Sequence, residues 1–218
     1  MMEYTFWSPI KLSLSIAITA GFIVLLLGLV AGKWMAHKQF KGKLFLETVL
    51  MLPLVLPPSV VGFLLIVIFG RNSVIGSFIE KITGQPIMFT WWAAVIASTV
   101  VAFPLMYQSV KTGFQSVNPD IEDAARTDGA SEMNLFLFIS IPLSIKSIIT
   151  GFILSFTRAL GEFGATLMFA GNIPGKTQTL PTAIYVAIDS GNMELAWLWV
   201  VTTVFISFLM LAATYLIK

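Results

Sequence analysis

Long runs of apolar residues alternate along this chain with short polar segments. Each run has about the roughly 20 residues that a helix needs to cross a hydrocarbon core of about 30 Å. The pattern therefore predicts an all-α integral membrane protein, a bundle of five transmembrane helices with short cytoplasmic helices. The predicted spans are approximately 10–31, 44–69, 89–107, 142–170 and 197–217.

A basic cluster after the first apolar run sets the expected orientation. It contains Lys33, Lys38, Lys41 and Lys43. Because Lys and Arg accumulate in cytoplasmic loops, this loop is expected to be cytoplasmic. The N-terminus is then outside, and alternation of five spans places Lys218 in the cytoplasm.

The second apolar run is interrupted by Pro53, Pro57 and Pro58, which Ser59 follows. Proline lacks an N–H and clashes with the preceding helical turn, so this stretch predicts a broken helix. Broken backbone at membrane depth is tolerated only where protein buries it or water fills a cavity. We interpret these four residues as part of a translocation path or gate. A kink that only shapes packing remains the alternative.

The fourth apolar run carries an ionisable pair, Arg158 and Glu162. Residues four apart are neighbours on one helix face. Charged groups at membrane depth normally face the bundle interior or a water-filled cavity. This pair is therefore a second candidate for the path or gate. The alternative is a pair near the membrane surface that only holds the helix.

One acidic segment, 118–141, separates the third and fourth runs. Five acidic residues lie between Asp120 and Glu132, so the segment is expected outside the lipid. Asn118 can cap a helix, Pro119 suits its first position, and Gly129 suits a left-handed stop. These signals predict one short helix of roughly ten residues.

The predicted short helix needs a partner. Isolated helices shorter than about 12–15 residues are marginal in water. Its narrow apolar face consists of Ile121, Ala124 and Ala125, at positions i, i+3 and i+4. We therefore expect the helix to dock on another surface.

Composition supports the membrane assignment. The chain has 218 residues, of which 57% are hydrophobic and 11% charged, with a mean hydropathy of +0.89. Soluble domains carry about 25% charged residues. The sequence shows no basic surface interleaved with aromatic residues, so we do not expect nucleic-acid binding. The first apolar run lacks a basic leader and a small-residue cleavage site, so we do not expect a cleaved signal peptide.

Candidate chemistry is sparse. The chain has no cysteine, and its single histidine, His37, lies among lysines, where a solvated position is a better interpretation than a metal or proton-relay site. Residues 170–177 approach the phosphate-loop pattern, but Ala170 occupies the place of the first glycine and no strand is predicted before it. We expect no enzyme activity, no metal site and no cofactor in this chain. Energy for uphill transport would come from a partner or an ion gradient.

The acidic segment resembles the EAA motif of ABC importer permeases. That motif is Glu-Ala-Ala, three residues, Gly, nine residues, Ile, one residue and Leu-Pro. Matching positions are Asp123, Ala124, Ala125, Gly129, Ile139, Ile141 and Pro142. The chain departs from the motif at Asp123 and Ile141, and both substitutions preserve charge or apolar character.

The resemblance narrows to the molybdate permease group. It is carried by residues 52–58, 122–130, 160–165 and 172–175, spread over most of the chain. Sulfate permeases share the EAA region, so residues 52–58 and 172–175 carry the narrower assignment.

The resemblance implies a type I fold and a homodimer in the prokaryotic plasma membrane. It also implies two cytoplasmic ABC ATPase subunits that bind ATP and Mg, and an extracytoplasmic molybdate-binding protein. The ATPase-coupling residues it implies are Ile121, Glu122, Asp123, Ala124, Ala125, Gly129 and Pro142.

The implied function is ATP-driven import of molybdate, with tungstate as a further substrate. Three alternatives remain at this point. One is a sulfate-type permease. Another is an ion-coupled secondary transporter, although such carriers often have an inverted repeat and we detect none. The third is a membrane-embedded enzyme, which would need a convergent catalytic set.

Overall fold

A computed structural model describes residues 2–215, with side chains from Phe6 onward. The described chain is built of helices joined by short loops, as the apolar pattern predicts, and contains no strand. Its helices, in chain order, are α1 (Met2–His37), α2 (Lys43–Val55), α3 (Pro58–Phe69), α4 (Val74–Thr83), α5 (Trp91–Gln115), α6 (Pro119–Thr127), α7 (Glu132–Leu135), η1 (Phe136–Ser140, a π-helix), α8 (Ile141–Leu143), α9 (Ile145–Leu160), α10 (Gly164–Ala170), α11 (Leu180–Asp189) and α12 (Met193–Tyr215).

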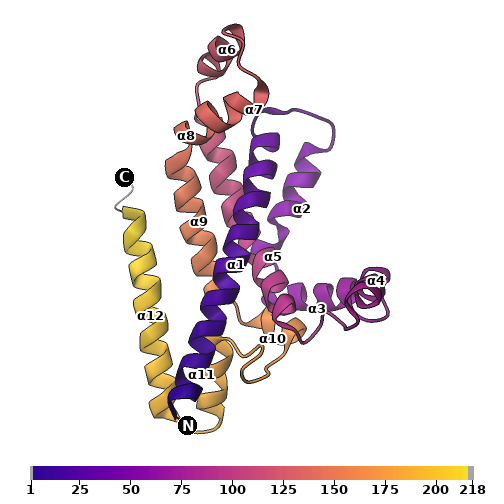
Figure 1. Cartoon of the computed structure of the whole chain (residues 1–218), viewed down its shortest axis with the longest axis vertical. Helices are drawn as coiled ribbons and strands as arrows, with labels where there is room; N and C mark the ends of the chain where they lie inside the picture. Colours follow the sequence, from indigo (N-terminus) through magenta and orange to yellow (C-terminus); the bar gives the residue numbers. More distant parts are fainter. Residues whose placement is uncertain (1, 216–218) are drawn as a thin grey trace.

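Helices α1 and α5 form the centre of the bundle and run side by side (Figure 1). Two glycines of α1 make their close approach possible. A Cβ added at Gly28 would lie 2.6 Å from Cγ of Met106, and one added at Gly32 would lie 2.6 Å from Cγ1 of Val110. The buried face of α5 is rich in alanine and valine, which keeps this contact tight. At 1.5 Å per residue, α1 is about 54 Å long and exceeds the hydrocarbon core at both ends.

The predicted proline break lies at Leu56 and Pro57. Helices α2 and α3 meet there at a bend of 117°. Pro57 is the N-cap of α3 and Pro58 its first residue, a position where the missing N–H costs nothing. Pro53 remains inside α2, so it does not contribute to the break. The predicted second span is therefore two helices, and α3 turns sideways across the bundle (Figure 1).

The fourth predicted span, 142–170, is also divided. Helix α9 ends at Leu160, and after a short turn α10 begins at Gly164 and packs against α3. The stretch 142–170 is therefore not one continuous helix, and its crossing of the membrane as one span stays a prediction. At the other end, α7 through α8 and α9 form a pair bent by 74°, just after Pro142. Proline lacks an N–H and clashes with the preceding turn, which here is the π-helical turn η1, so Pro142 accounts for the irregular helix before it and not for the bend after it.

The C-terminal helices attach to the N-terminal half of α1. The short helix α11 starts next to Pro181 and buries Leu180 and Ala183. The indole N–H of Trp199 in α12 donates a hydrogen bond of 3.0 Å to the carbonyl oxygen of Phe6. Beyond this contact α12 is mainly apolar, and its residues are exposed or half-buried. The predicted end of the last span at residues 216–218 lies outside the described residues.

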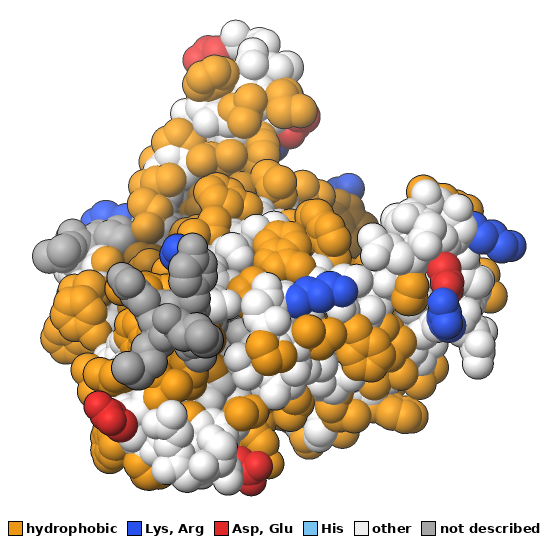
Figure 2. All heavy atoms as spheres, turned by 60° about the horizontal axis from the view of Figure 1, so that its bottom comes forward, with side chains coloured by type: hydrophobic (Ala, Val, Ile, Leu, Met, Phe, Trp, Pro, Cys, Tyr) orange, Lys and Arg blue, Asp and Glu red, His pale blue; other side chains and the backbone are white. Residues whose placement is uncertain are grey.

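The surface has the composition of a membrane protein. Hydrophobic side chains dominate the face in Figure 2, and charged side chains are few and scattered. In the described chain, α1, α5 and α12 are long and apolar enough to cross a membrane alone. The bent pairs α2–α3 and α7–α9 would raise the number to five. The prediction of five spans is compatible with these helices, and its exact bounds stay a prediction.

Candidate functional site

The acidic segment forms a separate projection at one end of the bundle, opposite the N-terminus (Figure 1). Its helix α6 begins and ends where the sequence predicts. The Asn118 side chain accepts a hydrogen bond of 3.0 Å from the N–H of Asp120, and Pro119 is the first helical residue. Gly129 follows the last turn with φ +88°, a left-handed conformation that glycine adopts without strain.

Glu122 anchors α6 to the bundle. Its side chain turns inward, and the residue is only 6% exposed. Lys33 Nζ of α1 lies 2.6 Å from Glu122 Oε1, and the Ser140 hydroxyl donates to the same oxygen at 2.7 Å. Lys33 Nζ also donates to Ser140 Oγ at 2.9 Å. We call Lys33, Glu122 and Ser140 the anchor triad; it joins α1, α6 and the π-helical turn η1.

The anchor triad keeps Glu122 ionised. Burial favours the neutral acid and pushes the pKa of this carboxyl up. Hydrogen bonds from Lys33 and Ser140, with the positive charge of Lys33, outweigh burial and leave the pKa below its ordinary value. Glu122 is therefore a carboxylate at neutral pH, held by charge-assisted hydrogen bonds.

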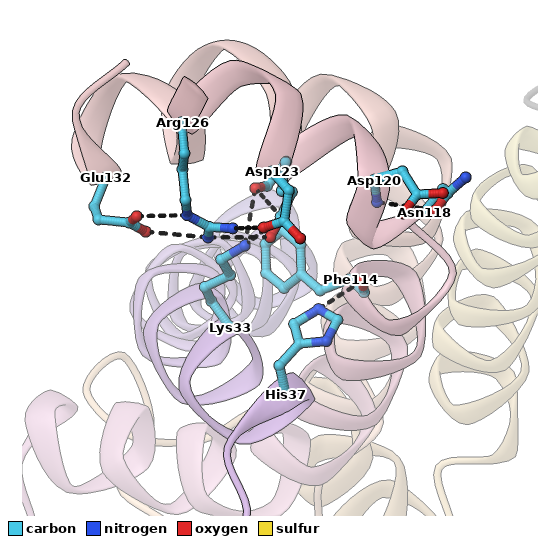
Figure 3. Close-up of polar contacts among 10 residues, drawn as sticks. Lys33, His37, Phe114, Asn118, Asp120, Asp123, Arg126 and Glu132 are labelled. Atoms are coloured by element: carbon cyan, nitrogen blue, oxygen red, sulfur yellow. Dashed lines mark hydrogen bonds and ion pairs between the residues drawn. The ribbon is translucent and has the colours of Figure 1, made fainter. Parts of the chain in front are cut away.

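Arg126 makes a second, more exposed set of contacts (Figure 3). Its guanidinium lies 2.7 Å from Asp123 Oδ1 and 2.7 Å from Glu132 Oε1. Hydrogen bonds to Glu132 and Asp123 raise the pKa of Arg126, and the same guanidinium lowers the pKa of Glu132. Exposed pairs of this kind contribute little energy each, so this set mainly fixes the angle between α6 and α7.

The remaining predicted residues of α6 divide by exposure. Ile121, Asp123 and Ala124 lie on the exposed surface, and Ala125 is half-buried. Ile121 is a large apolar residue on α6, away from the long apolar helices, and yet it is 45% exposed. Ile121 and Ala124 therefore form a small exposed apolar surface, whereas Glu122 is covered by this chain itself.

Sequence reasoning missed Lys33 and Ser140. Lys33 was interpreted only as a marker of orientation, and 89 residues separate it from Glu122. No local pattern links residues at that separation. One signal was available: Lys33 is the first charge after a long apolar run, at a helical position that cannot easily leave the bundle.

The second group of predicted residues lies where α3 and α10 meet. Arg158 pairs with Glu162 at 2.7 Å, as the four-residue spacing predicts. Glu162 is 2% exposed, and its second oxygen accepts a hydrogen bond of 2.8 Å from the N–H of Ala165. The carboxylate therefore caps the start of α10 and explains why a new helix begins there.

The proline break contacts this second group. A Cβ added at Gly164 would lie 2.8 Å from Cβ of Pro58 and 3.5 Å from the backbone nitrogen of Ser59. The structure thus brings together the start of α3 and the loop that holds Glu162. Pro53 lies on the other side of the bend, inside α2. The phosphate-loop-like stretch 170–177 joins α10 to α11 and so follows a helix, as its rejection requires.

Comparison with known proteins gives one consistent result. Residues 24–218 match the family described as binding-protein-dependent transport system inner membrane component. The protein YvgM of Bacillus subtilis, which carries the provisional name of a molybdenum transport system permease, is 66% identical over 94% of this chain and 91% of its own length. The molybdenum transport system permease ModB of Escherichia coli is 42% identical over 86% of this chain and 82% of its own length.

The fold is also similar to a solved structure. The methionine ABC transporter MetNI, in an inward-facing conformation, superposes with a TM-score of 0.74 over 99% of this chain and 95% of the transporter chain. The identity is 17%, so this likeness concerns the fold alone.

Proposed function

Because this chain belongs to the family of binding-protein-dependent transport system inner membrane components, an ABC importer permease family, we propose that it imports molybdate. Tungstate, an oxyanion of the same shape and charge, is a further candidate. The observation that carries the proposal is 66% and 42% identity, over most of both chains, to permeases named for molybdenum transport. Those relatives are transport permeases, and we propose that this chain likewise has no catalytic site of its own.

We propose that α6 is the coupling helix that a cytoplasmic ABC ATPase contacts. The exposed Ile121, Asp123 and Ala124 supply the contact surface. The anchor triad then links any displacement of α6 to α1 and, through Ser140 in η1, to Pro142 and α9. Charge-assisted bonds of 2.6–2.7 Å make this a stiff connection. In this proposal ATP and Mg bind the ATPase.

The translocation path is proposed at the contact between the proline break and the Arg158–Glu162 pair. A dianion pays a large cost in hydrocarbon and needs a polar route. Only one guanidinium nitrogen of Arg158 is bonded to Glu162, and the remaining N–H groups can bind an oxyanion. The exposed residues Pro57, Pro58 and Ser59 would line the route in a homodimer. An extracytoplasmic binding protein would deliver the substrate.

Reconstitution tests the proposed function. The chain would be assembled in liposomes with its ATPase and binding protein, and ATP hydrolysis compared with the binding protein empty or loaded with molybdate, tungstate or sulfate. We expect stimulation by molybdate. If only the sulfate-loaded form stimulates hydrolysis, the substrate is sulfate and not molybdate. If no loaded form stimulates hydrolysis, the importer proposal is contradicted.

Glu162→Gln is expected to lower the transport rate about tenfold without changing subunit assembly. Glutamine can still accept the Ala165 N–H bond, but Arg158 loses its charged partner. Loss of a hydrogen bond to a charged group costs about 1.5–3 kcal/mol, and about 1.4 kcal/mol corresponds to a factor of ten. Uptake in proteoliposomes measures the effect. Glu80→Gln, which removes the exposed partner of Arg71, is the matched control and should transport normally.

A cysteine at Ser190 is expected to react with an impermeant thiol reagent from outside the cell. The chain has no native cysteine, and Ser190 is exposed at the end of α11, at the end of the bundle away from α6. Gln39→Cys, in the basic loop after α1, is the matched control and should react only after permeabilisation. The opposite result at both positions would invert the proposed orientation.

A further inference from the structure

A groove between the end of α1 and α6 is lined in part by Lys33 and Glu122 of the anchor triad, but the function proposed above gives it no ligand. Its volume is about 560 Å³. Basic side chains on its wall are Lys33, His37, Lys38 and Arg126, and the only carboxylate among its lining residues is Glu122. Lys33 pairs with Glu122, and Arg126 pairs with Asp123 and Glu132, so the basic side chains of the lining that have no carboxylate partner among the described residues are Lys38 and His37.

Apolar side chains line the groove among the basic ones. Val30, Trp34 and Phe136 line it, and Val30 is 70% exposed. Lys38 Nζ lies over the Trp34 ring, 5.8 Å from its centroid, and Phe40 packs on the same indole. Basic and apolar side chains interleaved along one face of α1 suit an amphipathic anion better than a small inorganic one.

The depth of the groove indicates which amphipathic anion. The predicted first span is centred near residue 20, so Val30 lies about 15 Å and Trp34 about 20 Å from the membrane centre. A hydrocarbon core of about 30 Å ends about 15 Å from its centre, and the headgroup region begins there. Val30 is thus at the edge of the acyl chains and Trp34 is in the headgroup region. The backbone of Lys38 lies farther out, about 27 Å from the centre, but its side chain lies over the Trp34 ring and so reaches the headgroup level.

We propose that this groove is a binding site for an anionic phospholipid. Its phosphate lies between Lys38 and His37, and an acyl chain covers Val30 and Trp34. The Nε2 of His37 contacts the carbonyl oxygen of Phe114 at 3.2 Å (Figure 3), and the His37 side chain is part of the groove lining. Basic pockets at the cytoplasmic side of membrane helices bind anionic headgroups in this way. A bound lipid would also cover the anchor triad, because Lys33 and Glu122 line the same groove.

Native mass spectrometry of the permease–ATPase complex tests the proposal. The complex would be taken from nanodiscs of equal phosphatidylglycerol and phosphatidylcholine, and the retained lipid identified. We expect retained phosphatidylglycerol, and about fivefold less of it in Lys38→Gln, since one Lys at the surface contributes about 1 kcal/mol to anionic lipid binding. Trp34→Ala should also reduce retention, whereas Lys41→Gln, an exposed lysine of the next loop outside the groove, should not.

Three results would overturn the proposal. The first is equal retention of the two lipids by the wild-type complex. The second is equal loss in Lys38→Gln and Lys41→Gln, which would indicate a diffuse charge effect. The third is complete displacement of the lipid by millimolar inorganic phosphate, which would assign the groove to a soluble anion. All three readouts are independent of molybdate, so they do not depend on the proposed substrate.

Discussion

Ala124→Trp is expected to abolish ATPase binding while leaving the permease inserted and folded. Ala124 is exposed on α6, so an indole there meets no other part of this chain. Against a close-packed partner surface, an oversized side chain costs about 1–3 kcal/mol. Two copies of α6 in the proposed homodimer would double this cost, which weakens binding at least roughly 25-fold. Co-purification of the ATPase and stimulated ATP hydrolysis measure the loss.

Ala124→Ser is the matched control for this experiment. Serine adds one oxygen at the same site and keeps the helix, so the complex should survive. Normal ATPase binding by Ala124→Trp would show that this face of α6 is not the contact. Loss of membrane insertion in that variant would instead indicate a folding defect, and thermal unfolding of the isolated permease separates the two outcomes.

Glu122→Ala is expected to release α6 from the bundle and uncouple ATP hydrolysis from transport. The change leaves Lys33 without its carboxylate and Ser140 without its acceptor. Breaking a buried ion pair by removing one partner costs about 3–5 kcal/mol of stability. Because Lys33 is partly exposed, we expect the lower end of this range, about 3 kcal/mol. That energy corresponds to an approximately 100-fold increase in the population with α6 detached. Hydrogen exchange of amides 120–127 should accelerate by the same factor.

A second variant distinguishes the ion pair from simple packing. Lys33→Met combined with Glu122→Met removes both charges and keeps the volume, so it should restore much of the protection that Glu122→Ala loses. Unchanged exchange in Glu122→Ala would contradict an anchoring role. Because the folded-state pKa of Glu122 is lowered, its contribution is complete above the ordinary carboxyl pKa of about 4.3 and is lost as pH falls through the lower folded value. The acceleration of hydrogen exchange by Glu122→Ala should therefore be the same at pH 6 and pH 8.

The sequence predicted the parts of the molecule that depend on neighbouring residues. Apolar runs long enough for a membrane gave the all-α class, and Asn118, Pro119 and Gly129 gave α6 its bounds almost to the residue. Capping and left-handed backbone are local effects, so a few positions determine them. The pairing of Arg158 with Glu162 has the same origin, because the helix geometry between positions i and i+4 is fixed.

The same local rules failed where packing chose between alternatives. Three prolines predicted a break but could not say which one makes it, and Pro53 stays helical while Pro57 and Pro58 begin a new helix. The apolar stretch 142–170 had the length of one span, yet the buried Glu162 caps a second helix at Gly164. One long helix and the pair α9 and α10 have the same sequence and therefore the same hydrophobicity. Only the contact of α10 with α3 distinguishes the two arrangements.

By itself, the sequence determined the membrane class, the capped acidic helix and the EAA-like motif, since each depends on composition or on residues within about a turn or two of one another. Only the tertiary structure decided that Glu122 turns away from the exposed face of α6 and meets Lys33 and Ser140. The physical reason is that a carboxylate on a short helix can face either water or a partner with little difference in the free energy of the helix itself. Its choice is made by a lysine 89 residues away, which only the packing of α1 against α5 and η1 brings within 2.6 Å.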